Sequence, residues 1–208
     1  MYRRREVEAV TVPRADIEVD VDMENVETGC YLWGAYVSNR SSVDLVEIGY
    51  RAFETWEELT PETDAANSLR FWEWLMSIRE EVRSQGLTFR AYGWNLGAEN
   101  QPLKRMAIAA GLLDEVDRFI ASDEWVDLLK IWDAQFITGH SSGLKLIAPL
   151  TGFAWSVDDA GGADSMVMYD VAVGETADAR PSREWLLTYN QAYRLRPKFP
   201  LVQRGDLA

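Results

Sequence analysis

The feature that most constrains the fold is an alternating segment at residues 16–24, Asp-Ile-Glu-Val-Asp-Val-Asp-Met-Glu. Acidic and apolar residues that alternate with a period of two predict a half-buried β-strand. Alternate side chains on a strand project from the same face, so Asp20, Asp22 and Glu24 are expected to lie side by side. Two interpretations are open. The acids either form the solvated outer face of an edge strand, where charge discourages further pairing, or they bind cations that neutralise them.

The remaining patterns predict one α/β domain with a mixed sheet flanked by helices. Aromatic and β-branched runs at 31–37 and 43–53, separated by turn residues at 39–42, predict an antiparallel meander of three strands with the first segment. Thr60-Pro61 predicts the start of a helix that ends near Gly86. The further expected elements are a parallel strand at 87–94, a helix at 99–110, a helix marked by Trp125, Leu128, Leu129 and Trp132, a short helix at 143–150, a loop at Gly161-Gly162 and a helix at 181–193.

Composition narrows the classes of function. The 208 residues suffice for one well-filled domain. No run approaches the roughly 18 apolar residues that span a bilayer, and no apolar segment follows the basic N-terminus as in a signal peptide, so we expect a cytoplasmic protein without membrane contact. One Cys and one His exclude a disulfide within the chain and a zinc site built on Cys or His. The net charge of −13 opposes binding to phosphate backbones unless cations stand between the acids and the phosphate.

Several short stretches, taken in order, resemble a known family. They are Asp22-Met23-Glu24 and the stretches at 31–34, 92–103, 143–150, 160–166 and 185–190. In this order, spread over residues 15–190, they are similar to the ribonuclease-H-like domain of the DEDD exonuclease superfamily. More narrowly, they resemble the C-terminal domain of the RecB-like nuclease family. The resemblance implies residues 1–14 as an N-terminal extension, 15–193 as the nuclease domain and 194–208 as a divergent tail.

The resemblance also implies an activity and a site. The activity is 3′–5′ exonuclease hydrolysis of phosphodiester bonds in DNA or RNA, with Mg²⁺ or Mn²⁺ as cofactor. Asp22 and Glu24 would form the first metal motif and Glu99 the acid of the second, with Tyr189 beside them as a catalytic residue that orients water. Taken alone, Glu99 is also explained as an acid that complements a helix dipole, and Tyr189 as a buried aromatic residue.

The third motif departs from the family pattern. In the family, a His-Asn or Tyr-Asn pair is followed after two residues by an Asp that completes the metal site. Here Tyr189-Asn190 are followed by Gln191-Ala192, and Tyr193 stands at the expected position of the acid. Asp164, which otherwise predicts a helix N-cap, and Asp206 are the acids considered as replacements. The departure predicts impaired hydrolysis, and the alternative is an inactive ribonuclease-H-like module that serves in binding or interaction.

Other expectations concern partners and two further residues. The family carries a separate N-terminal nuclease domain, so the resemblance implies a detached or truncated C-terminal domain that works with such a domain or with a protein partner. A third hypothesis is an acidic mimic of nucleic acid. Lys145 is interpreted either as a phosphate contact or as packing along a helix surface. His140 is expected in a loop.

Overall fold

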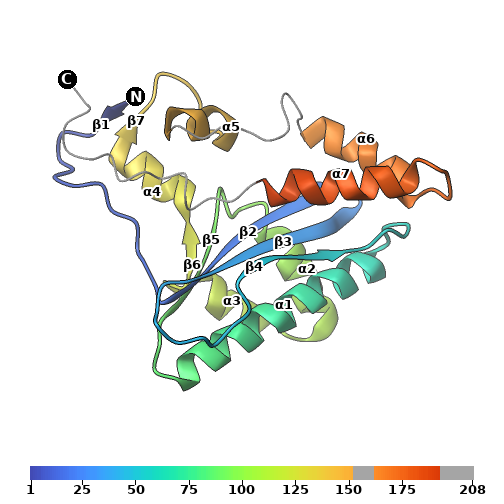
Figure 1. Cartoon of the computed structure of the whole chain (residues 1–208), viewed down its shortest axis with the longest axis horizontal. Coiled ribbons are helices and arrows are strands. Elements are labelled where there is room, and N and C mark those ends of the chain that lie inside the picture. Colours follow the sequence, from blue (N-terminus) through green and yellow to red (C-terminus); the bar gives the residue numbers. More distant parts are fainter. Residues whose placement is uncertain (152–161, 193–208) are drawn as a thin grey trace.

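The central element of the fold is a five-stranded mixed sheet (Figure 1). The computed structural model describes residues 1–151 and 162–192. The strand order is β4-β3-β2-β5-β6; β2, β3 and β4 are antiparallel, whereas β5 and β6 run parallel to β2. The expected meander and parallel strand are thus confirmed, and β6 adds a second parallel strand. The strands are β2 (Ile17–Val26), β3 (Gly29–Asn39), β4 (Gly49–Glu54), β5 (Phe89–Gly93) and β6 (Trp125–Asp127).

Helices cover both faces of this sheet (Figure 1). One face carries α1 (Pro61–Ser84), α2 (Asn100–Ala110) and α3 (Leu113–Ile120), and the other carries α6 (Gly162–Val173) and α7 (Ala179–Gln191). Beyond the end of β6 lie α4 (Leu128–Gln135), α5 (Leu144–Ile147), the 3-10 helix η1 (Ala148–Thr151) and a two-stranded sheet of β1 (Tyr2–Arg3) and β7 (Phe136–Ile137). In the two described ranges, no helix combines the length and apolar character that a membrane crossing requires.

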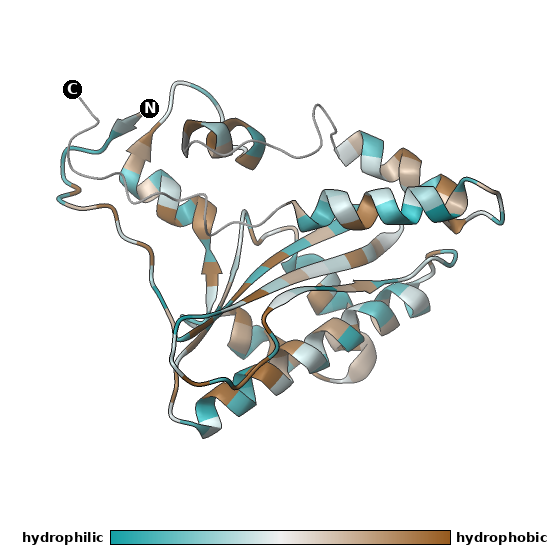
Figure 2. Cartoon of the chain, viewed as in Figure 1, coloured by the Kyte–Doolittle hydropathy of each residue, from teal (hydrophilic) through white to brown (hydrophobic). Residues whose placement is uncertain are grey.

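The main hydrophobic core fills the space between the sheet and α1, α2 and α3. The apolar residues of the alternating segment, Ile17, Val19 and Val21, point into it and are at most 1% exposed. Trp33 stacks on Phe71 of α1, with ring centroids 4.4 Å apart. Figure 2 shows the same alternation as brown, hydrophobic positions that recur along the strands and along α1. The period of two therefore fixes which face of β2 is apolar, as expected.

The interpretation of the acids as the outer face of an edge strand is wrong. β2 is the middle strand of the sheet, and its acidic face lies under α6 and α7. Glu18 is 0% exposed and Glu24 is 7% exposed. Burial of a carboxylate requires partners: Glu18 forms an ion pair with Arg14 and accepts hydrogen bonds from the Ala15 backbone and the Tyr92 hydroxyl.

Local capping explains where the strands and helices differ from expectation. The segment 43–53 pairs only from Gly49 onward, since Asn39 accepts a hydrogen bond from the Ser41 backbone and donates one to Val43, which holds a loop. Trp125 lies on β6, not on a helix, because Asp127 accepts hydrogen bonds from the first backbone N–H groups of α4 and sets its start.

The structure also contains elements that the sequence did not predict, and α6 begins earlier than expected. α3 and the pair of strands β1 and β7 were not expected. Gly162 begins α6 instead of lying in a loop, so Asp164 stands in the first turn and is not the N-cap. Gly161 lies outside the described residues.

The start of α1 allows a test of stability. Thr60 and Thr63 form a reciprocal capping box, and Thr60 accepts a hydrogen bond of 3.2 Å from the Thr63 backbone. We expect Thr60→Ala to lower the free energy of unfolding by about 1 kcal/mol, the usual cost of a lost N-cap. Urea titration measures the change. Ser77→Ala, at an exposed position in the middle of α1, is the control and should change stability by less than about 0.5 kcal/mol.

Candidate functional site

The candidate site is the acidic face of β2 beneath α6 and α7. Asn190 on α7 donates a hydrogen bond of 3.0 Å from Nδ2 to Asp22 Oδ2. Ser165 on α6 donates one of 3.1 Å to Glu24 Oε2. Asn190 also forms a hydrogen bond with Glu24. The first and third motifs suggested by the resemblance therefore meet in space, although Asp22 and Asn190 are 168 residues apart in the chain.

Gly34 makes this approach of α7 possible. It lies directly opposite Asp22 in the pairing of β2 with β3. A Cβ atom at Gly34 would lie 1.6 Å from Asn190 Oδ1, so any other residue would displace the amide. The same Oδ1 atom accepts a 2.9 Å hydrogen bond from the hydroxyl of Tyr50 on β4. Asp22 on β2, Gly34 on β3 and Tyr50 on β4 thus together fix the position of the Asn190 side-chain amide.

Burial, more than charge, sets the pKa values at the site. Burial raises the pKa of Glu24 to about 7, although hydrogen bonds from Ser165 and Asn190 and the charge of Lys145 oppose the rise. Burial and the charges of Asp22, Glu54 and Glu24 raise the pKa of the Tyr50 phenol. Tyr50 therefore stays protonated and remains a donor to Asn190.

A small cavity of about 10 Å³ lies beside Asp22. Its lining includes Asp20, Asp22, Gly34, Tyr50 and Asn190. This volume is close to that of one water-sized probe. The space next to the Asp22 carboxylate accordingly suits one small polar species.

Glu99 lies elsewhere, just before α2. It is 4% exposed, and its Oε2 atom has no hydrogen-bond partner among the described residues. Burial, with a smaller contribution from the charge of Asp127, raises its pKa to about 8. No three or more His, Cys, Asp or Glu residues within 1–151 and 162–192 are grouped so that they could hold a metal ion. Asp22, Glu24 and Glu99 consequently do not form one cluster there, and a metal role for Glu99 stays a prediction.

Of the other residues suggested by the sequence, Tyr189 is buried, whereas Asp164 and His140 are exposed. Tyr189 is 4% exposed and stacks on Trp185, with ring centroids 5.1 Å apart; this fits a buried aromatic residue, and its catalytic role stays a prediction. Asp164 is exposed on α6, and His140 is exposed in a loop, as expected. Tyr193 and Asp206, and with them the divergent tail, lie outside the described residues.

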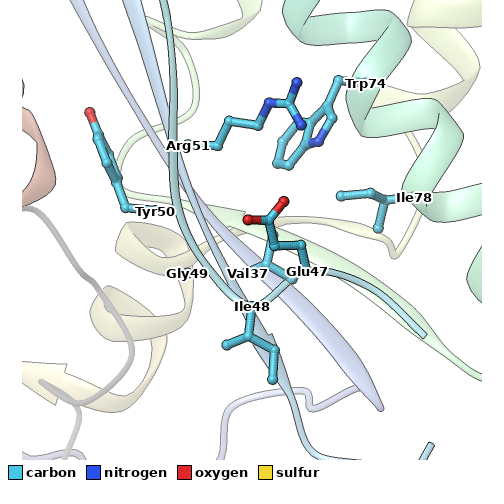
Figure 3. Close-up of a pocket in the computed structure, with 8 residues that line it drawn as sticks. All are labelled: Val37, Glu47, Ile48, Gly49, Tyr50, Arg51, Trp74 and Ile78. Carbon is cyan, nitrogen blue, oxygen red and sulfur yellow. The ribbon is translucent and has the colours of Figure 1, made fainter. Parts of the chain in front are cut away.

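A cavity at the edge of the sheet is separate from the acids. It has a volume of about 430 Å³ and lies where β4 and the loop before it face α1. Figure 3 shows the Arg51 guanidinium beside the Trp74 ring in this cavity, while Tyr50 points to the other side of β4. Arg51 also lies over Phe53, at 5.3 Å from the ring centroid. The Arg51 side chain that lines this cavity thus already makes cation–π contacts with Phe53 and Trp74.

Sequence reasoning missed the roles of Gly34, Tyr50 and Ser165. Gly34 and Ser165 belong to stretches that carry the resemblance, but the sequence did not predict their contacts with Asn190 and Glu24. A glycine inside a strand signals a close approach of another group, and that signal was available for Gly34. Tyr50 carries no such signal, because an aromatic residue on a strand is ordinary.

Comparison with known proteins identifies no relative of this chain. No family model, no curated protein and no solved structure matches the chain. The chemistry of the site is accordingly argued from its own residues.

Proposed function

We propose that this chain is a ribonuclease-H-like nuclease domain that hydrolyses phosphodiester bonds of nucleic acid with one divalent cation held by Asp22 and Glu24. The observation that carries the proposal is the convergence of separate stretches on one site. Four stretches of the resemblance each contribute one residue around these acids: Gly34, Lys145, Ser165 and Asn190. These residues come from β3, α5, α6 and α7, so four separate elements meet around the two acids.

The sheet supports the same proposal. The chain order of strand, strand, strand, helix, strand and helix in β2, β3, β4, α1, β5 and α2 is the order that the resemblance implies. The acids of the first motif lie on the middle strand, where the side chains are held by neighbours on both sides. A rigid strand at this position is a good platform for a functional site.

The residues present fit one cation better than two. Mg²⁺ is commonly bound through one or two carboxylates, with water in its other positions. Asp22 and Glu24 supply two carboxylates, and Asn190 and Ser165 orient them. A pair of ions needs more acids, and the described residues hold no third one in the cluster. A bound divalent cation would supply Lewis-acid stabilisation of the phosphate charge.

Calorimetry with Mn²⁺ tests the cation site. We expect one ion per chain, and at least tenfold weaker binding for Asp22→Asn and for Glu24→Gln, because loss of a ligand costs at least as much as the 10–100-fold loss typical of outer-shell partners. Glu27→Gln, an exposed acid just after β2, is the matched control and should bind Mn²⁺ like the parent chain. If the parent chain binds no Mn²⁺, the proposal fails.

Hydrolysis is measured on end-labelled single-stranded DNA and RNA with Mg²⁺ or Mn²⁺. Slow removal of nucleotides from the 3′ end, lost in Asp22→Asn, is the expected outcome. Tyr193→Asp restores the acid that the resemblance expects and should raise the rate. If both the parent chain and Tyr193→Asp are inactive, the catalytic part of the proposal is contradicted.

A second candidate is an inactive module that retains the fold for binding or interaction. The observation in its favour is that Asn190 and Ser165 already donate hydrogen bonds to Asp22 and Glu24 without a cation. Tyr50 in turn donates one to Asn190. Hydrolysis separates the candidates. Any hydrolysis that depends on Asp22 would contradict the inactive module, whereas a parent chain that neither binds Mn²⁺ nor hydrolyses nucleic acid would support it.

A further inference from the structure

Lys145 is exceptional among the lysines of the described chain. Lys104 pairs with Asp117 at 2.9 Å, and Lys130 pairs with Asp127 at 3.7 Å. The Lys145 ammonium forms no salt bridge or hydrogen bond within residues 1–151 and 162–192; its one directed contact there is with the ring of Tyr189. In a chain with 34 acidic and 21 basic residues, an ammonium without a carboxylate partner is unexpected.

The surroundings of Lys145 place this ammonium at the edge of the acidic site. Nζ lies 5.3 Å from the centroid of the Tyr189 ring, a distance typical of a cation–π contact. Tyr189 in turn stacks on Trp185 at an interplanar angle of 7°, which fixes the ring. The charge of Lys145 acts on Glu24, the acid bonded to Ser165. The ammonium is therefore held close to Glu24 by an aromatic surface and not by an ion pair.

We propose that Lys145 binds a phosphate oxyanion of the nucleic acid at the edge of the site formed by Asp22 and Glu24. This inference rests on the proposed function and adds to it the residue that receives the substrate phosphate. The aromatic contact leaves the three N–H donors of an ammonium free to bind an anion. An ion pair with Glu24 would instead use them.

Electrostatics explains why the site needs such a residue. The carboxylates of Asp22 and Glu24 repel a phosphate, and the net charge of −13 adds to the repulsion. A cation at Asp22 and Glu24 offsets the acids, and the Lys145 ammonium supplies the remaining attraction for the anion. Lysine serves well here because it binds phosphate as a point charge.

Binding of thymidine 5′-monophosphate tests the inference, with thymidine as the probe that lacks the phosphate. Calorimetry on the full chain is run with saturating Mn²⁺ and without metal. We expect the monophosphate to bind and thymidine to bind much more weakly. Lys145→Met should weaken binding of the monophosphate about tenfold or more, the loss expected for one charge-assisted hydrogen bond. Lys145→Arg keeps the charge and should retain most of the affinity.

Two controls keep the result interpretable. Lys104→Met removes an ion-paired lysine on α2 and should leave nucleotide affinity unchanged. Reductive methylation of the parent chain, followed by mass spectrometry, needs no variant: the monophosphate should protect Lys145 and not Lys104 or Lys130.

Three outcomes would contradict the inference: no nucleotide binding by the parent chain in either condition, equal nucleotide affinity in Lys145→Met, or no protection of Lys145. The cation site is judged separately from Mn²⁺ binding alone. A parent chain that binds the monophosphate through Lys145 but binds no Mn²⁺ would uphold the inference and refute the proposed cation site.

Discussion

Gly34→Ala is expected to lower the free energy of unfolding by about 3 kcal/mol, although it adds a single methyl group. The new Cβ would lie 1.6 Å from Asn190 Oδ1, so the amide has to rotate away. Rotation breaks the hydrogen bonds to Asp22 and Tyr50 and leaves partly buried polar groups unsatisfied, at a cost of roughly 1–3 kcal/mol for each such group. We also expect Mn²⁺ affinity to fall at least tenfold, because Asp22 loses the group that orients it. Urea titration and calorimetry measure the two effects.

A double-mutant cycle identifies the cause. Asn190→Ala removes the atom that the new methyl group would meet, so Gly34→Ala in the Asn190→Ala background should cost less than about 1 kcal/mol. The remaining neighbour, Tyr50 Cε2, lies 3.1 Å from the Cβ position and needs only a small shift. Equal costs in the two backgrounds would show that Gly34 is required for another reason.

Glu99→Gln is expected to stabilise the protein at alkaline pH and to change the dependence of stability on pH. Glu99 has an ordinary pKa of 4.5 and a pKa of about 8 in the folded protein. Between these values the folded state binds more protons than the unfolded state, so the parent chain loses stability as pH rises through this window. At about 1.4 kcal/mol for each pKa unit, the loss amounts to at most roughly 5 kcal/mol above pH 8. A neutral glutamine avoids it.

Thermal or urea unfolding at pH 5 and pH 9 tests this expectation. The stability of Glu99→Gln relative to the parent chain should rise by several kcal/mol from pH 5 to pH 9. Glu115→Gln, on the exposed surface of α3, is the matched control and should stay within about 0.5 kcal/mol of the parent chain at both pH values. A pH dependence that is identical in Glu99→Gln and the parent chain would mean that Glu99 is solvated in the folded state.

The fold was predictable where local patterns act alone. The alternation at 16–24 identified β2 and its apolar face, and Thr60-Pro61 identified the start of α1. Both signals depend on neighbours within a few residues. The position of β2 within the sheet was not predictable from alternation, because a central strand with helices on both faces usually lacks acids. Here the acids are tolerated only because residues from α6, α7 and elsewhere satisfy them.

Of the candidate site, the sequence suggested Asp22, Glu24 and Asn190 through the resemblance, but not the side chains that contact them. Tyr50 and Lys145 act through contacts that exist only once β4 and α5 are in place. Glu99 stands at the start of α2 and does not group with the other two acids among the described residues. No spacing rule contains that information.

The cover of α6 and α7 over β2 has a consequence for the order of folding. Ser165 and Asn190 reach Glu24 and Asp22 across 141 and 168 residues of chain, and contacts of such long range form late because loop closure costs entropy first. During synthesis, β2 leaves the ribosome well before the residues that cover its acids. Until then we expect those carboxylates to stay hydrated, and their charge to oppose pairing of the incomplete sheet with other chains. The acidic face is thus expected to limit aggregation before α6 and α7 cover it.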